Sequence, residues 1–85
     1  MPLVKLYANL RQVAGTKEVS LPGDSLRTIL FGLVEQYPAL GKILLENEQI
    51  RPHVIITVNG QTMIDLDMPV TEADQIAIFP PIAGG

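Results

Sequence analysis

The sequence predicts an α+β fold, in which a mixed sheet is crossed on one face by one main helix. Three observations lead to this prediction. One segment, 26–37, has apolar residues at the spacing of an amphipathic helix. Segments with the two-residue alternation of strands lie on both sides of it, at 3–8, 17–21, 53–58, 61–66 and 75–79. The resulting order, β-β-α-β-β-β, is typical of a sheet covered by its helix on one side.

Length and composition limit what the protein can be. Eighty-five residues are expected to form a single domain over 1–85, too small for an enclosed cofactor cavity. The absence of cysteine excludes disulfides and thiolate metal sites and fits a reducing, cytoplasmic compartment. The net charge of −3 and the scattering of the six basic residues argue against nucleic-acid binding. We see no bilayer-length apolar run and no signal peptide, so no membrane association is expected.

The first two predicted strands form an antiparallel hairpin. The alternation in 3–8 puts Tyr7 on the face opposite the apolar residues that point inward. Residues 9–16 are expected to be a turn that opens with a short helical piece, with Gly15 at positive φ. The second strand, 17–21, again alternates.

The main helix is predicted over 26–37. Asp24 or Ser25 is expected to cap its N-terminus, and Pro38 to end it. Gly32 costs about 1 kcal/mol relative to alanine, and we expect it to allow close packing on the sheet. The residues of the apolar stripe are Leu26, Ile29, Leu30, Leu33, Val34 and Tyr37.

The second half of the chain reads as one more helical turn and three strands. Residues 40–45 predict the helical turn, and 47–52 a loop. The segment 53–58 is rich in β-branched residues, and Asn59-Gly60 is a strong hairpin signal that leads into 61–66.

The last strand, 75–79, follows a tight connection and turns Phe79 outward. We expect the first and last strands to be central and parallel, because a strand that emerges from the middle of the sheet can project a tail clear of the body. This is a β-grasp arrangement.

The chain ends in Phe-Pro-Pro-Ile-Ala-Gly-Gly, residues 79–85. Prolines favour an extended path, and glycines lack the Cβ that would block a narrow channel. Residues 80–85 are therefore expected to be a tail that projects by about 20 Å and carries the Gly85 carboxylate. The alternative is a frayed terminus without function.

These features resemble the ubiquitin-like sulfur carriers of the MoaD/ThiS family, which includes the molybdopterin synthase small subunit and related archaeal small modifier proteins. The resemblance covers the whole chain, and its ending is the most specific part. The thiamine-pathway carrier ThiS is generally smaller and lacks the Phe-Pro-Pro, and is the weaker match. The matching motifs are Ala8-x-Leu10-Arg11, Ala14-Gly15, Val58-Asn59-Gly60 and Asp74-x-Ile76-Ala77-x-Phe79-Pro80-Pro81-Ile82-Ala83-Gly84-Gly85.

The resemblance implies a role for Gly85 as the reacting residue. An ATP-using adenylyltransferase of the MoeB or ubiquitin-activating type would adenylate its carboxylate, and a sulfur donor protein would convert it to a thiocarboxylate. The tail, Pro80, Pro81, Ile82, Ala83 and Gly84, would then enter a MoaE-like large subunit of molybdopterin synthase. The chain itself would bind no cofactor or metal and would not be an enzyme on its own.

Three further hypotheses stay open. The chain is a protein modifier joined to lysines through Gly85, or a sulfur carrier for another pathway such as thiamine synthesis or tRNA thiolation. Alternatively, it is a β-grasp binding module whose tail is incidental.

The resemblance also implies that partners grip the body near the tail. Strand parity turns Tyr7 and Phe79 away from the helix, and the family alignment places Met63 beside them, so these three residues are candidates for a docking patch. Scattered exposed apolar residues are the simpler interpretation. His53 and the acidic residues Asp65, Asp67, Glu72 and Asp74 are interpreted as solvated or structural.

Overall fold

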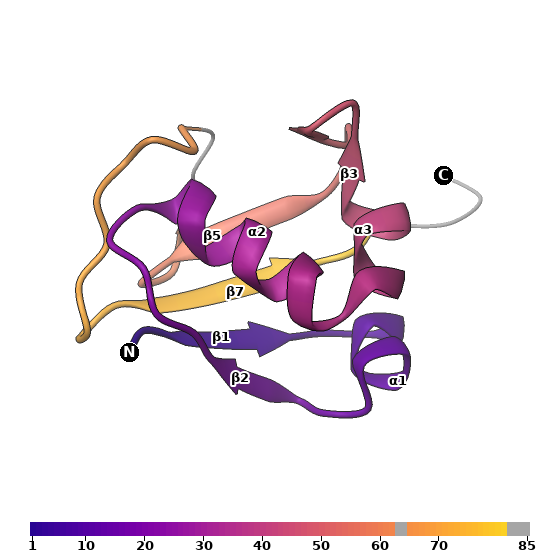
Figure 1. The fold of residues 1–85 in the computed structure, drawn as a ribbon, viewed down its shortest axis with the longest axis horizontal. Helices are drawn as coiled ribbons and strands as arrows, with labels where there is room; N and C mark the ends of the chain where they lie inside the picture. Colours follow the sequence, from indigo (N-terminus) through magenta and orange to yellow (C-terminus); the bar gives the residue numbers. More distant parts are fainter. Residues whose placement is uncertain (63–64, 82–85) are drawn as a thin grey trace.

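The computed structural model describes residues 1–62 and 65–81. Its main feature is a mixed five-stranded sheet in the order β2-β1-β7-β5-β6 (Figure 1). The neighbours β1 and β7 run parallel, and the other pairs are antiparallel. The expected central, parallel placement of the first and last strands is confirmed. The strands are β1 (Leu3–Leu6), β2 (Glu18–Ser20), β5 (Ile55–Val58), β6 (Gln61–Thr62) and β7 (Gln75–Phe79).

The main helix, α2 (Leu26–Gln36), crosses one face of this sheet (Figure 1). Ser25 is its cap, because its Oγ accepts a hydrogen bond from the backbone N–H of Thr28 at 3.2 Å. Pro38 ends α2 as expected and also begins the next helix, α3 (Pro38–Leu44), since proline is well tolerated in a first helical turn.

The core lies between α2 and the sheet. The members of the predicted helix stripe that are fully buried are Leu26, Ile29, Leu30 and Leu33. They meet the inward residues of the three central strands, which include Val4, Leu6, Ile56, Val58, Ile76 and Ile78. The helical spacing of apolar residues in 26–37 and the alternation in the strands therefore mark the two surfaces that meet in one core.

The role expected for Gly32 is wrong. A Cβ built at Gly32 meets nothing within 4 Å, so this glycine does not bring α2 close to the sheet. It lies beside Leu33, which points into the core, and one position along a helix turns a side chain by about 100°. Gly32 therefore faces an open surface of α2.

The loop predicted at 47–52 is partly wrong, because it contains half of a small hairpin. Strands β3 (Leu45–Glu46) and β4 (Gln49–Ile50) pair antiparallel around Asn47 and Glu48. Both turn residues have positive φ, 54° and 65°, as a two-residue hairpin turn requires. The sequence signal was weak because glutamate stands where such turns usually have glycine.

Other elements also differ in length from their predictions, among them the strand expected over 53–58, which begins only at Ile55. The turn after β1 is mostly a helix, α1 (Asn9–Ala14), which is closed by Gly15 at the expected positive φ of 76°. The strand expected over 61–66 is described only as β6, since residues 63–64 lie outside the described part and residues 65–66 are not in a strand.

Within the described residues, 1–62 and 65–81, no helix is long and apolar enough to cross a membrane.

Candidate functional site

An aromatic pair marks the end of the middle strand. The rings of Tyr7 and Phe79 stack with centroids 4.5 Å apart and an interplanar angle of 15°. The parallel register that pairs Leu6 with Ile78 puts the next residue of each chain segment on the same outer face of the sheet. Tyr7 N–H also donates to the carbonyl oxygen of Ile78 at 3.3 Å, which prolongs the ladder to the stack. The two residues proposed for docking are thus in contact, and both are half-buried.

Arg11 completes this cluster, although the sequence analysis gave it no role. Its guanidinium carbon lies 5.2 Å from the centroid of the Tyr7 ring, within the range of a cation–π contact. Its Nε donates to the carbonyl oxygen of Leu6 at 2.8 Å, which holds the side chain in place. The sequence signal for this contact was the spacing of four residues between Tyr7 and Arg11 across the start of α1. A positive charge therefore stands beside the aromatic pair.

Ile55 extends the apolar surface on the other side of Phe79. It is the antiparallel partner of Phe79 in the β5–β7 ladder, so both side chains lie on one face. Its exposed fraction, 46%, is high for a large apolar residue. We call Tyr7, Arg11, Ile55 and Phe79 the outer-face patch. The third predicted docking residue, Met63, lies outside the described residues.

The tail begins at this patch. The strand β7 is the middle strand of the sheet and ends at Phe79, and Pro80 and Pro81 follow it without regular secondary structure. The remaining predicted site residues, Ile82, Ala83, Gly84 and Gly85, lie outside the described part of the chain. Their roles in a channel and in chemistry stay predictions.

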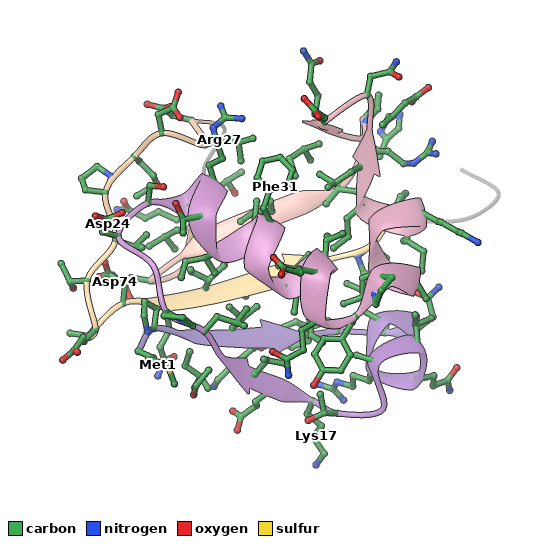
Figure 2. All side chains as sticks on the ribbon, viewed as in Figure 1. Met1, Lys17, Asp24, Arg27, Phe31 and Asp74 are labelled. Atoms are coloured by element: carbon green, nitrogen blue, oxygen red, sulfur yellow. The ribbon has the colours of Figure 1, made fainter. Side chains whose placement is uncertain are left out.

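The opposite end of β7 is held by a bridge between Asn59 and Asp74 (Figure 2 labels Asp74). Asn59 Nδ2 donates to Asp74 Oδ1 at 2.8 Å, and Gln75 N–H donates to Asn59 Oδ1 at 3.0 Å. Thr71 N–H donates to the second oxygen of Asp74 at 2.7 Å. The bond from Asn59, followed by that from Thr71, holds the pKa of Asp74 below its ordinary value, because both favour the charged carboxylate.

This bridge explains two of the sequence motifs. Asn59 has a φ of 53°, and its side chain spans from the β5–β6 turn to the first residue of β7. Asp74 and Asn59 therefore fix where the middle strand starts. Its carboxylate oxygens are both engaged, which supports a structural role over a cation site.

The other acidic residues are also placed as surface groups. Asp67 accepts a hydrogen bond from Arg27 Nε at 2.9 Å, which lowers the pKa of Asp67 below its ordinary value. Among the residues that the structure describes, no cluster of three histidine, aspartate or glutamate side chains could hold a metal. His53 is exposed.

Comparison with known proteins agrees with this arrangement. The ThiS family matches residues 4–85. The chain is 32% identical to small archaeal modifier protein 3 of Haloferax volcanii, and the match covers 96% of each chain. It is 31% identical to the molybdopterin synthase sulfur carrier subunit of Arabidopsis thaliana, over 96% of this chain and 80% of that one.

A solved structure shows the same fold. The solution structure of small archaeal modifier protein 1 from Methanosarcina acetivorans superposes with a TM-score of 0.86 at 33% identity, over 99% of this chain and 95% of that one. The predicted β-grasp fold is therefore confirmed. The chain belongs to the ThiS family of small ubiquitin-like sulfur carriers, together with the archaeal small modifier proteins.

Proposed function

We propose that this chain is the sulfur carrier subunit of a molybdopterin synthase and that the carboxylate of Gly85 carries the sulfur. The main support is the family match, which extends through Gly85 and includes a relative named as that subunit. The geometry is consistent with it. The middle strand leads into Pro80 and Pro81 next to the outer-face patch, so a partner that grips the patch also receives the tail.

Activation of Gly85 is needed because a carboxylate repels nucleophiles. In the proposed first step a carboxylate oxygen attacks the α-phosphorus of ATP, pyrophosphate leaves, and an acyl-adenylate forms. A sulfide equivalent from a sulfur donor protein then attacks the acyl carbon. The C–S bond forms as the C–O bond to AMP breaks, and AMP takes the electron pair. The product is a C-terminal thiocarboxylate, and ATP is bound by a MoeB-like activating enzyme.

The chain's own residues contribute recognition in this proposal. The stacked rings of the outer-face patch form a rigid apolar contact, and Arg11 adds a charge that an acidic residue of a partner can pair with. A MoaE-like large subunit and the activating enzyme would use this surface in turn, because both must accept the same tail.

The second candidate function is protein modification. It is favoured by the similarity to archaeal proteins named as modifiers, at 32% identity over nearly the whole chain. The acyl-adenylate is shared with the first function. Attack by a lysine amine in place of sulfide would release AMP and leave an amide bond between Gly85 and the target.

The test is mass spectrometry of the chain from its own host, on free and conjugated fractions. A free chain in which sulfur replaces one oxygen, on the peptide that contains Gly85, is expected for the carrier. Trypsin is unsuitable for detecting conjugates, because no lysine or arginine follows Arg51. Cleavage after Glu72 would leave residues 73–85 attached to a target lysine and identify the modifier.

Deletion of Gly85 provides the control. Because the residue lies beyond β7 and the core, the shortened chain is expected to unfold at the same temperature while losing both products. Partner function that survives the deletion would contradict both proposals and leave the binding module. Failure of a MoaE-like protein to co-purify from a host that expresses it would contradict the first.

A further inference from the structure

Phe31 has no place in the core. It lies on α2 between Leu30 and Gly32, and it is neither buried nor among the half-buried apolar residues that pack on the core. The outer-face patch does not include it, because α2 covers the other face of the sheet. A half-buried phenylalanine that lies outside both the core and the outer-face patch is a candidate interface anchor, because aromatic side chains commonly anchor interfaces.

Phe31 stands between two hollows on this side of the molecule. The first has a volume of ≈ 610 Å³ and is bounded by the β3–β4 turn and Leu66. The second has a volume of ≈ 700 Å³ and extends over Gly32 to Pro22. Figure 2 shows Phe31 and Arg27 pointing from α2 to the same side, away from β1 and β2. We call the two hollows and Phe31 the Phe31 groove.

The walls of the Phe31 groove are held by hydrogen bonds. Arg27 N–H donates to the carbonyl oxygen of Leu66 at 2.7 Å, and its side chain pairs with Asp67 at 2.9 Å. On the other side Arg51 N–H donates to Leu44 at 2.8 Å, which ties the β3–β4 hairpin to α3. A groove with fixed walls loses less conformational entropy when a partner enters.

The rim of the Phe31 groove is acidic. Glu48 lines the first hollow and Glu35 the second. Within residues 1–62 and 65–81, neither carboxylate has an ion-pair partner. The one cation that lines the hollows, Arg27, is already neutralised by Asp67. The groove therefore presents an aromatic ring flanked by two carboxylates that have no ion-pair partner among the described residues.

Glu48 holds its position at a cost in backbone strain. Its φ is 65°, whereas the equivalent turn of the β5–β6 hairpin, Asn59-Gly60, uses glycine at the second position. A non-glycine residue in this region is strained, because its Cβ comes too close to the carbonyl oxygen that follows it. The β5–β6 turn is thus relaxed, whereas the β3–β4 turn has a strained backbone that places the Glu48 carboxylate beside Phe31.

We propose that the Phe31 groove is a second docking surface, which binds a segment of a partner protein with an apolar side chain flanked by lysine or arginine. The apolar side chain would pack on Phe31, and the basic residues would pair with Glu35 and Glu48. A second copy of this chain is a poor occupant, because its net charge of −3 has the same sign as Glu35 and Glu48. The groove and the outer-face patch lie on opposite sides of the sheet, so two partners can hold the protein at once.

The experiment follows backbone amide shifts by NMR while a peptide is added. The probe has one tryptophan with two arginines on each side, and its counterpart has glutamates in place of arginines. The basic peptide is expected to shift the amides of residues 31, 32 and 48, and its affinity is expected to fall with added salt. The acidic counterpart is expected to cause no saturable shift.

Variants assign the binding to the groove. Phe31→Ser, and separately Glu35→Lys with Glu48→Lys, are each expected to weaken binding about tenfold or more. The matched controls are Ile55→Ser, which removes an exposed apolar residue from the outer-face patch, and Glu18→Lys, which reverses a charge on β2. Both are expected to change the affinity of the peptide less than threefold, because neither residue lines the Phe31 groove.

Three results would overturn the proposal. One is the absence of saturable binding at millimolar peptide. Another is an affinity that Phe31→Ser leaves unchanged. The third is a set of shifts centred on Tyr7 and Phe79, which would place the basic peptide on the outer-face patch. None of these results bears on the sulfur carrier proposal, which rests on Gly85.

Discussion

The stacking of Tyr7 on Phe79 predicts a measurable coupling between two residues at opposite ends of the chain. Each is replaced by alanine, singly and together, and the free energy of unfolding is measured. At a centroid distance of 4.5 Å and an angle of 15°, such a pair contributes about 0.5–1.5 kcal/mol beyond the area that it buries. The double variant is therefore expected to lose less free energy of unfolding than the two single variants lose in sum, and the difference is expected to equal that coupling.

The assay is urea unfolding followed by far-ultraviolet circular dichroism. In a domain of this size 1 kcal/mol corresponds to about 4–8 °C in the melting temperature, so thermal unfolding provides an independent check. The contact of Arg11 with Tyr7 cancels in the cycle, because both Tyr7 variants lose it.

The control cycle pairs Tyr7 with Phe31, which lies on the other side of the sheet. These two effects are expected to add within about 0.3–0.5 kcal/mol. A Tyr7–Phe79 coupling inside that range, or one no larger than in the control cycle, would refute the inference that the stacked rings stabilise each other in the folded protein.

Three further predictions concern the turns and the helix. Gly32→Ala is expected to raise the free energy of unfolding by up to about 1 kcal/mol, because the added Cβ meets open space in a helix. Gly60→Ala is expected to lower it, because Gly60 has a φ of 85°. Changes of the same sign in urea unfolding would contradict this reasoning. Glu48→Gly is expected to stabilise the protein by about 1 kcal/mol by relieving positive φ, and a lower melting temperature would show that the turn is not strained. The pKa of Asp74 is lower in the folded protein than its ordinary value of 3.8, mainly because Asn59 donates a hydrogen bond to it. Its contribution to stability is therefore present above that ordinary value and is lost as the pH falls through the lower pKa of the folded state. Asp74→Asn is expected to flatten that acid dependence, although Asp67 retains its part, and an unchanged pH profile of stability would disprove the bridge.

Local patterns were sufficient for most of the fold. The apolar stripe of α2 depends only on residues within a few turns of one another, and its four buried leucine and isoleucine residues were all predicted. The Asn59-Gly60 turn needs no tertiary context, because its two residues readily adopt positive φ. The β3–β4 turn was missed because Glu48 has a positive φ that glutamate does not favour, so its sequence gives only a weak turn signal.

The sequence by itself determined the strands of the main sheet, the main helix, the faces that they bury and the family. The tertiary structure decided which exposed residues meet. Tyr7 joins Phe79 only through the parallel pairing of β1 with β7, and Arg11 and Ile55 join them from two further elements. The Phe31 groove likewise needs α2, the β3–β4 turn and Leu66 together. Periodicity reports which side of an element faces the core, but long-range pairing sets the neighbours across elements, because it depends on the packing of the whole chain.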